Sequence, residues 1–232
     1  MKLFTVLILA LTSSVAHAQT FHYPVIKSNA PRLTDFVPAG WEIFNQATGD
    51  LNKDGLVDAA LVLEKSTGNG KAHGQGSTDL GPPRMLVVLL KSPTNKGYAV
   101  SVQSNSFIPS HDDPETDDPF AGLAIARGVL KIGFQYNRSD SHDDISTSAY
   151  KFRYDGHQFV LIGADIDITG RMSFTFQKFS YNFLNRKGVF TTGPLGDEAD
   201  ETLTKTVRLP APKTLTTFTK PGTWLISEDF SL

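Results

Sequence analysis

Short apolar or alternating runs recur along this chain, separated by Gly, Asn, Asp and Pro. No stretch keeps the period of about 3.6 residues that marks an amphipathic helix. Alternation with a period of two places successive side chains on opposite faces of a strand, so runs this short favour strands. The pattern predicts an all-β fold of antiparallel sheets with long loops, arranged as a sandwich or as a complete or partial propeller.

Ten segments have the composition of strands, and the turns between several of them carry Gly or Asn, which tolerate the positive φ of hairpins. Weaker strand candidates follow Leu203. The ten predicted strands are Trp41–Gln46, Asp58–Glu64, Arg84–Lys91, Tyr98–Gln103, Phe120–Ala126, Val129–Tyr136, Ser148–Tyr154, Gln158–Asp165, Met172–Asn182 and Gly188–Thr192.

Two of these segments make further predictions. The run Met85–Leu90 lacks alternation, so we expect it at the centre of the fold, covered on both faces. The aromatic residues of 172–183 change parity, because 174 and 176 are even whereas 179, 181 and 183 are odd. A β-bulge near Gln177 would return them to one face. We expect these aromatic side chains in the core; an exposed stripe that binds a partner is the alternative.

The N-terminus has the three parts of a secretory signal: Lys2, the apolar run Leu3–Leu11, and a small-residue cleavage site at Ala16–Ala18. We therefore predict a signal peptide at 1–18, a single domain at 19–232, and a periplasmic or secreted protein. The chain has no cysteine, so disulfides cannot stabilise it in an oxidising compartment. Stability must come from packing, to which a bound metal ion could add.

The charge balance is mildly acidic. The chain has 22 Lys and Arg against 24 Asp and Glu, and removal of Lys2 with the signal peptide leaves 21 against 24. A nucleic-acid-binding protein needs a basic stripe, and no basic run appears in the sequence. Met85–Leu90 is far shorter than the roughly 20 residues that span a bilayer, so no membrane insertion is expected after signal cleavage.

The segment GDLNKDGLVD at 49–58 concentrates carboxylates and a carboxamide just before a predicted strand. Acidic and amide side chains at alternate positions allow one loop to surround a hard cation, and calcium takes about 6–8 oxygen ligands. Gly55 would form the sharp turn. The predicted calcium ligands are the side chains of Asp50, Asn52, Asp54 and Asp58 and the backbone carbonyl of Leu56.

A hairpin turn is the alternative interpretation of this loop, because an Asp-Gly pair suits a turn without metal. A turn does not require Asp50 or Asp58, however, and their charges would repel Asp54 in an empty loop. The loop is not an EF-hand, since the twelfth position from Asp50 is Leu61, inside a predicted strand, where an EF-hand needs Glu.

GDLNKDGLVDAALVL resembles the calcium-binding loop of integrin α-chain FG-GAP repeats and related VCBS-type repeats, which form propeller blades. With RMLVVLLK, DPFAGLAIARGVLKIGF and YKFRYDGHQFVLIGAD, it is similar to a group of uncharacterised exported bacterial proteins that carry one such loop. The resemblance implies a structural calcium ion and a propeller-like sheet arrangement. The single copy of the loop is as compatible with an open arrangement as with a closed propeller.

The tetrapeptide SHDD occurs twice, on either side of the predicted hairpin 120–136. Both flanks emerge at the open end of the hairpin, so the two loops could meet there. Histidine and carboxylate ligands suit zinc, manganese or a second calcium ion, whereas ordinary solvated loops are the alternative. The residues of this weaker second site are His111, Asp113, His142 and Asp144.

No nucleophile elbow or thiol nucleophile occurs, and no catalytic residue is predicted. We expect an exported, calcium-binding β module that binds a protein or a cell-envelope component without catalysis. Two alternatives remain open: a metal-dependent hydrolase that uses the two SHDD loops, and an exported inhibitor or immunity protein.

Overall fold

The computed structural model describes residues 21–67, 81–94, 96–111, 117–137, 144–196, 203–227 and 230–232. The predicted signal peptide lies outside these residues. The described chain is all-β, with a five-stranded and a seven-stranded antiparallel sheet, and contains no α-helix. The predicted fold class is confirmed. Within the described ranges, no helix is long and apolar enough to cross a membrane.

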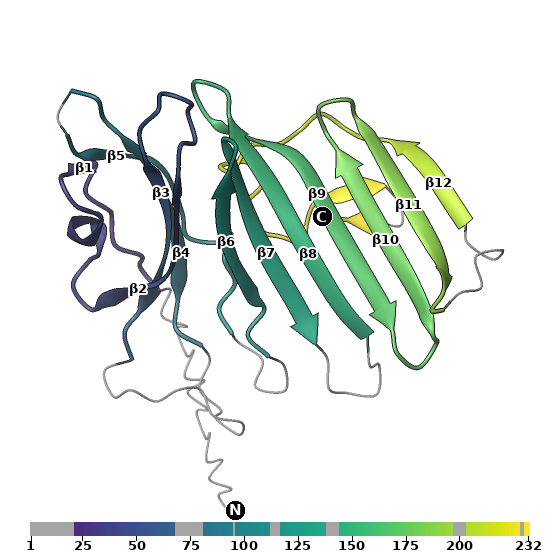
Figure 1. Cartoon of the computed structure of the whole chain (residues 1–232). Helices are drawn as coiled ribbons and strands as arrows, with labels where there is room; N and C mark the ends of the chain where they lie inside the picture. The colour runs from purple at the N-terminus through teal and green to yellow at the C-terminus, as the bar shows by residue number, and fades with distance from the viewer. Residues whose placement is uncertain are drawn as a thin grey trace, which may run out of the picture.

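The five-stranded sheet is formed by the N-terminal part of the chain, in the order β1-β5-β4-β3-β2, and is seen edge-on in Figure 1. A short 3-10 helix, Leu33–Phe36, precedes β2. The strands are β1 (Asn29–Ala30), β2 (Trp41–Gly49), β3 (Asp58–Lys65), β4 (Arg84–Lys91) and β5 (Tyr98–Ser104).

The seven-stranded sheet is a meander in which each strand pairs with the next along the chain, and Figure 1 shows it face-on. Its strands are β6 (Phe120–Ala126), β7 (Val129–Asn137), β8 (Asp144–Tyr154), β9 (Phe159–Gly170), β10 (Thr175–Asn182), β11 (Lys187–Pro194) and β12 (Leu203–Arg208). The C-terminal segment passes behind this sheet and ends in a small hairpin of β13 (Leu225–Ser227) and β14 (Phe230–Ser231).

Each of the ten predicted strands corresponds to an observed strand, but the predicted bulge near Gln177 is wrong. The pairing of β10 with both neighbours runs without a shift from Thr175 to Asn182. Phe174 instead has a positive φ of 51° just before the strand and is 68% exposed. Phe176 and Phe179 therefore remain on opposite faces. The core interpretation holds for Phe179, Tyr181 and Phe183, which are all buried.

Strand β4 lies at the centre of the five-stranded sheet, and Met85 to Leu89 are fully buried, as the unbroken apolar run predicts. One face of the sheet packs against the N-terminal segment, including Phe36. The other face joins the inner face of the seven-stranded sheet and the C-terminal segment in a continuous core. Burial on both faces fixes the register, because a slip by one residue would exchange the two sets of side chains.

The two sheets meet where the edge strands β2 and β6 run close together, and a buried arginine holds this junction. The rings of Phe44 on β2 and Phe120 on β6 lie 5.7 Å apart, and the Arg84 guanidinium lies 4.2 Å from the Phe44 ring centroid. Arg84 donates two hydrogen bonds to Asp118, at 2.7 and 2.6 Å, and one to Glu64 at 2.6 Å. We call these five residues the junction cluster.

The charges of the junction cluster stabilise one another. Burial alone would lower the pKa of Arg84 and raise that of Asp118, but their hydrogen bonds outweigh burial, so the pKa of Arg84 is raised and that of Asp118 is lowered. A carboxyl group with a lowered pKa stabilises the fold fully above the unfolded value of about 4. This contribution is lost as the pH falls through the lowered pKa of the folded protein.

We expect Arg84→Lys to reduce the free energy of unfolding by about 2 kcal/mol or more, because a lysine cannot bind two carboxylates in fork geometry and leaves buried charge uncompensated. Arg32→Lys is the matched control, since Arg32 pairs with Asp35 but its side chain is 77% exposed. It should cost at most about 0.5 kcal/mol. Urea denaturation at neutral pH measures both, and equal losses would contradict the role of the junction cluster.

Candidate functional site

The predicted calcium loop connects β2 to β3 and lies against the turn between β6 and β7, beside the edge where the sheets meet. Gly49 approaches β6 so closely that an added Cβ would lie 2.6 Å from Cγ2 of Ile125. Leu51 is 1% exposed and belongs to the core between the sheets. The side chain of Lys53 reaches Gly128 in the β6–β7 turn. Order in this loop is therefore coupled to the contact between the sheets.

Backbone and amide N–H groups surround the exposed carboxylates of the loop. Asp50 accepts hydrogen bonds from the backbone of Lys53 at 2.6 Å and of Gly55 at 2.9 Å. Asp54 accepts one from the backbone of Leu56 at 2.8 Å and one from Nδ2 of Asn52 at 3.0 Å. These donors offset part of the repulsion between the carboxylates, so charge balance alone does not require a cation.

Asp58 differs from the other acidic residues because it is fully buried at the start of β3. Its Oδ2 accepts hydrogen bonds from the backbone of Leu51 at 2.7 Å and Asn52 at 3.4 Å, and its Oδ1 accepts one from Lys91 at 2.7 Å. Burial raises the pKa of Asp58, and these three N–H donors counteract the rise. Asp58 thus fastens the loop to the end of β4.

The loop fits a calcium ion in part. Asp50, Asn52 and Asp54 present oxygen acceptors on an exposed turn, which suits a hard cation. Asp58 fits less well, because it is fully buried, whereas the N–H-bonded carboxylates of Asp50 and Asp54 lie on the exposed turn. In the described part of the chain, no group of three or more His, Cys, Asp or Glu residues is placed to hold a metal ion. Calcium binding therefore stays a prediction.

Half of the weaker second site lies outside the described residues, namely Asp113 and His142. Burial raises the pKa of Asp118, the Arg84 hydrogen bonds lower it, and the charge of the nearby His111 adds a smaller lowering effect. Asp144 begins β8 and pairs with Gly170 on β9. The structure does not bring the four residues together as a described cluster.

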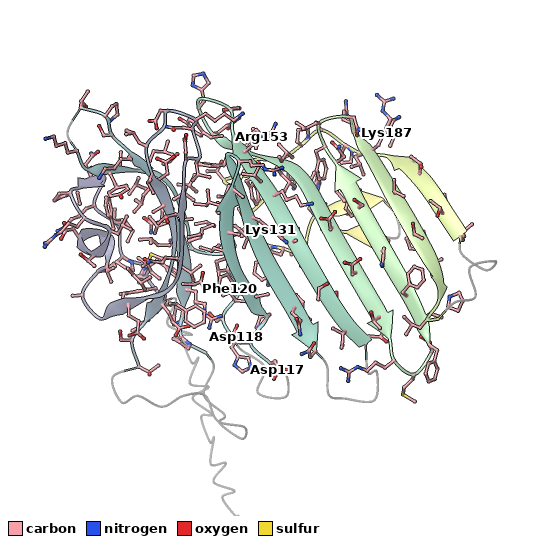
Figure 2. The ribbon with its side chains drawn as sticks, in the orientation of Figure 1. Asp117, Asp118, Phe120, Lys131, Arg153 and Lys187 are labelled. Carbon is pink, nitrogen blue, oxygen red and sulfur yellow. The ribbon has the colours of Figure 1, made fainter. Side chains whose placement is uncertain are left out.

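The flanks of the two SHDD loops do meet, as the hairpin pattern predicts. Nδ2 of Asn137, at the end of β7, donates a hydrogen bond to Asp117 at 3.0 Å. The backbone N–H of Gln135 donates to the carbonyl of Pro119 at 2.8 Å. Figure 2 places Asp117 and Asp118 beside the lower end of β6. Metal binding by these loops stays a prediction.

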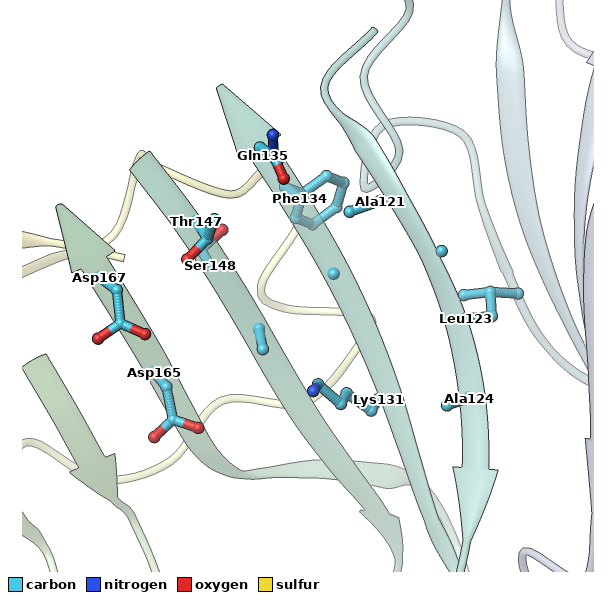
Figure 3. Close-up of a pocket in the computed structure, with 13 residues that line it drawn as sticks. Ala121, Leu123, Ala124, Lys131, Phe134, Gln135, Thr147, Ser148, Asp165 and Asp167 are labelled. Atoms are coloured by element: carbon cyan, nitrogen blue, oxygen red, sulfur yellow. The ribbon is translucent and has the colours of Figure 1, made fainter. Parts of the chain in front are cut away.

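The outward face of the seven-stranded sheet, which we call the outer face, has a shallow furrow of about 380 Å³. Gly133 and Ala149 on adjacent strands contribute small residues to its lining, whereas Lys131, Asp165 and Asp167 supply charge. Figure 3 shows Lys131 on β7 and the two aspartates on β9. The furrow is open to solvent and has polar and charged groups along its margins.

Four cations occupy one cross-strand row of the outer face, and we call them the cationic row. Lys131 lies directly opposite Lys151, and Lys187 lies directly opposite Arg208. Between these two pairs, the row passes through Gly163 on β9 and Asn182 on β10. Among the described residues, only Lys151 of this row has an ion pair, with Asp165. Like charges directly opposite one another destabilise a sheet, so the row favours an anionic neighbour.

No protein-family model, curated protein or solved structure matches the chain. The resemblance to FG-GAP and VCBS-type loops therefore rests on the sequence of the loop.

Neither the cationic row nor the buried role of Asp58 is predicted by the sequence patterns. The four cations are spread over residues 131–208 and come together only through strand register. Alternation along each predicted strand places a lysine on one face of the sheet. It does not say which residues of other strands lie beside that lysine. Asp58 was recognised as part of the loop, but nothing in the sequence marks its backbone donors.

We expect Asp58→Asn to lower the free energy of unfolding by about 1–3 kcal/mol, because the new NH2 group would face a buried N–H donor and leave it unsatisfied. The loss should be the same with calcium and with chelator. Asp54→Asn is the control, since Asp54 is exposed and its replacement should cost less than about 0.5 kcal/mol without calcium. Chemical denaturation of both variants in chelator tests the difference, and similar losses would disprove the anchoring role of Asp58.

Proposed function

We propose that this protein is an exported, calcium-stabilised β module that binds an acidic protein partner in the cell envelope and performs no catalysis. The like-charge pairs of the cationic row are the observation that carries this proposal. Export follows from the signal-like N-terminus, with a periplasmic or secreted destination. The calcium component follows from the loop at 50–58 and its resemblance to FG-GAP and VCBS-type loops.

Asp50, Asn52 and Asp54 would hold calcium through side-chain oxygens, and Leu56 through its backbone carbonyl. Bound calcium would supply positive charge that offsets the remaining repulsion between the carboxylates. The chain itself already orders the loop through the N–H donors to Asp50 and the anchor at Asp58. The role proposed for calcium is to stabilise this loop and, through Leu51 and Gly49, the contact between the sheets.

The outer face supports an acidic partner. Arg153 lies two residues from Lys151 on β8 and adds a further positive charge near the cationic row. Lys131 and Lys187 form no ion pair with any acidic side chain in the described ranges. Figure 2 shows Lys131, Arg153 and Lys187 on the seven-stranded sheet. An anionic group that docks along the row would relieve the repulsion between neighbouring cations.

The two aspartates of the furrow favour a protein over a lipid surface. Asp165 and Asp167 lie on the same face as the cationic row, Asp165 in the next row and Asp167 in the row beyond it. A uniformly anionic membrane would place negative charge against both carboxylates. A protein surface can present carboxylates to the row and neutral or basic groups to the aspartates, which matches the mixed charge of this face.

We expect millimolar calcium to raise the melting temperature of the mature protein relative to chelator, because a ligand at ten times its Kd stabilises the native state by about 1.4 kcal/mol. Asp54→Ala should abolish this gain by removing a proposed ligand. Asp167→Ala, which removes an exposed carboxylate on β9 that is assigned to no metal site, should retain it. A gain that persists in Asp54→Ala would refute the ligand assignment, and no gain in the wild type would refute calcium binding.

We expect Lys131→Glu/Lys187→Glu to lose a partner that the wild type retains from a cell-envelope extract, because two positions of the cationic row change sign. Lys96→Glu, in the exposed β4–β5 turn, should retain the partner. Elution of the partner by high salt would support charge pairing. Identical captured proteins for all three forms, or sedimentation of the wild type with phosphatidylglycerol vesicles, would overturn the proposal.

A further inference from the structure

The inner face of the seven-stranded sheet, opposite the outer face, is only partly covered. Leu215, Phe218 and Leu232 of the C-terminal segment are buried in the core on this side. Beside this covered region lies a cleft of about 400 Å³, bounded by strands β7 to β10 and by Pro221 and Gly222. Sites for small molecules commonly have volumes of about 300–1,000 Å³, so this aromatic cleft is large enough for a small ligand.

Two tyrosines that line the aromatic cleft differ in the hydrogen bonding of their hydroxyl groups. Tyr181 lines the cleft and is 5% exposed, and its hydroxyl forms no hydrogen bond with any described residue. Burial raises the pKa of Tyr181 to about 12. Tyr150, which is 2% exposed, has partners, since its hydroxyl is hydrogen-bonded to Ser148 and to the backbone of Gly222. With no partner among the described residues, the Tyr181 hydroxyl is available to hydrogen-bond a ligand in the cleft that it lines.

The aromatic cleft also offers a flat apolar surface. The rings of Phe179 and Tyr181 are nearly parallel, at 14°, with centroids 6.3 Å apart. Both side chains are held by neighbouring rings, because Phe179 also packs on Phe190 and Tyr181 on Phe183. Ile166 and Ile168 extend the apolar wall onto β9. Such a preformed surface suits a ligand with a flat C–H face.

The polar groups of the aromatic cleft are neutral. Its described lining includes the hydroxyl groups of Tyr136, Ser146, Ser148 and Tyr181 and the amide of Gln177, but no charged side chain. A charged ligand would lose hydration here without gaining an ion pair among these residues. A ligand with a single hydroxyl, such as a phenol, would satisfy few of them. Several hydroxyl groups around a flat ring match this lining better.

We infer that the aromatic cleft binds an uncharged pyranose sugar, as a mono- or disaccharide. The flat C–H face of the sugar ring would lie on the aromatic wall, and its hydroxyl groups would pair with Tyr181, Gln177 and the serines. The aromatic cleft and the cationic row lie on opposite faces of the sheet. This inference therefore depends neither on the proposed acidic partner nor on calcium.

Saturation-transfer NMR of the mature protein with N-acetylglucosamine, maltose and cellobiose tests the inference, with glucuronate as the charged comparison. We expect saturable binding of at least one neutral sugar at millimolar concentration and much weaker binding of glucuronate. Tyr181→Phe should weaken binding about five-fold, the usual effect of losing one hydrogen bond, without changing the melting temperature. Tyr98→Phe, on the five-stranded sheet, is the matched control and should bind normally.

Gln177→Ala provides a second variant, because Gln177 is exposed at the cleft and its replacement should weaken sugar binding without loss of stability. The inference fails if none of the three neutral sugars binds, if glucuronate binds as well as they do, or if Tyr98→Phe weakens binding as much as Tyr181→Phe. Binding of indole in preference to every sugar would also overturn it. These results would leave the calcium and partner proposals unaffected.

Discussion

The salt bridges of Arg84 are the interaction on which the arrangement of this protein depends. A guanidinium that is 2% exposed joins Glu64 of the five-stranded sheet to Asp118, the residue that leads into the seven-stranded sheet. A buried charge with only one of these partners would be strongly destabilising, whereas the two carboxylates together satisfy its donors. The position of β6 against β2, and with it the position of the whole meander, follows from this pairing and from the ring contact between Phe44 and Phe120.

The calcium loop and the junction cluster lie along the same pair of edge strands. Asp58 fastens the loop to β4 from within, while Leu51 and Gly49 place it against the second sheet. Local order in the loop and contact between the sheets therefore support each other. The two faces of the meander remain available for binding because the five-stranded sheet and the C-terminal segment cover only part of the inner face and none of the outer cationic row.

Sequence patterns predicted the strands well, because each depends on local alternation and on turn residues. The buried run Met85–Leu90 was correctly assigned to the centre of a sheet, since only strands covered on both faces are apolar throughout. The bulge near Gln177 is wrong because β10 keeps an unbroken register, so Phe176 stays on the face opposite Phe179, and Phe174 lies in the turn before the strand. The composition of the loop predicts a candidate site, but the bond from Lys91 on β4 that anchors Asp58 depends on the folded sheet and could not be predicted.

The sequence by itself determined the all-β class, the strand positions, the absence of disulfides and the acidic loop, because each is expressed within a few consecutive residues. The tertiary structure alone decided that Asp58 is a buried anchor, that distant lysines form one row, and that Tyr181 lies in a cleft. These features arise from register and from the packing of segments tens of residues apart. A local pattern places a side chain on a face, but only the folded sheet determines which residue lies beside it.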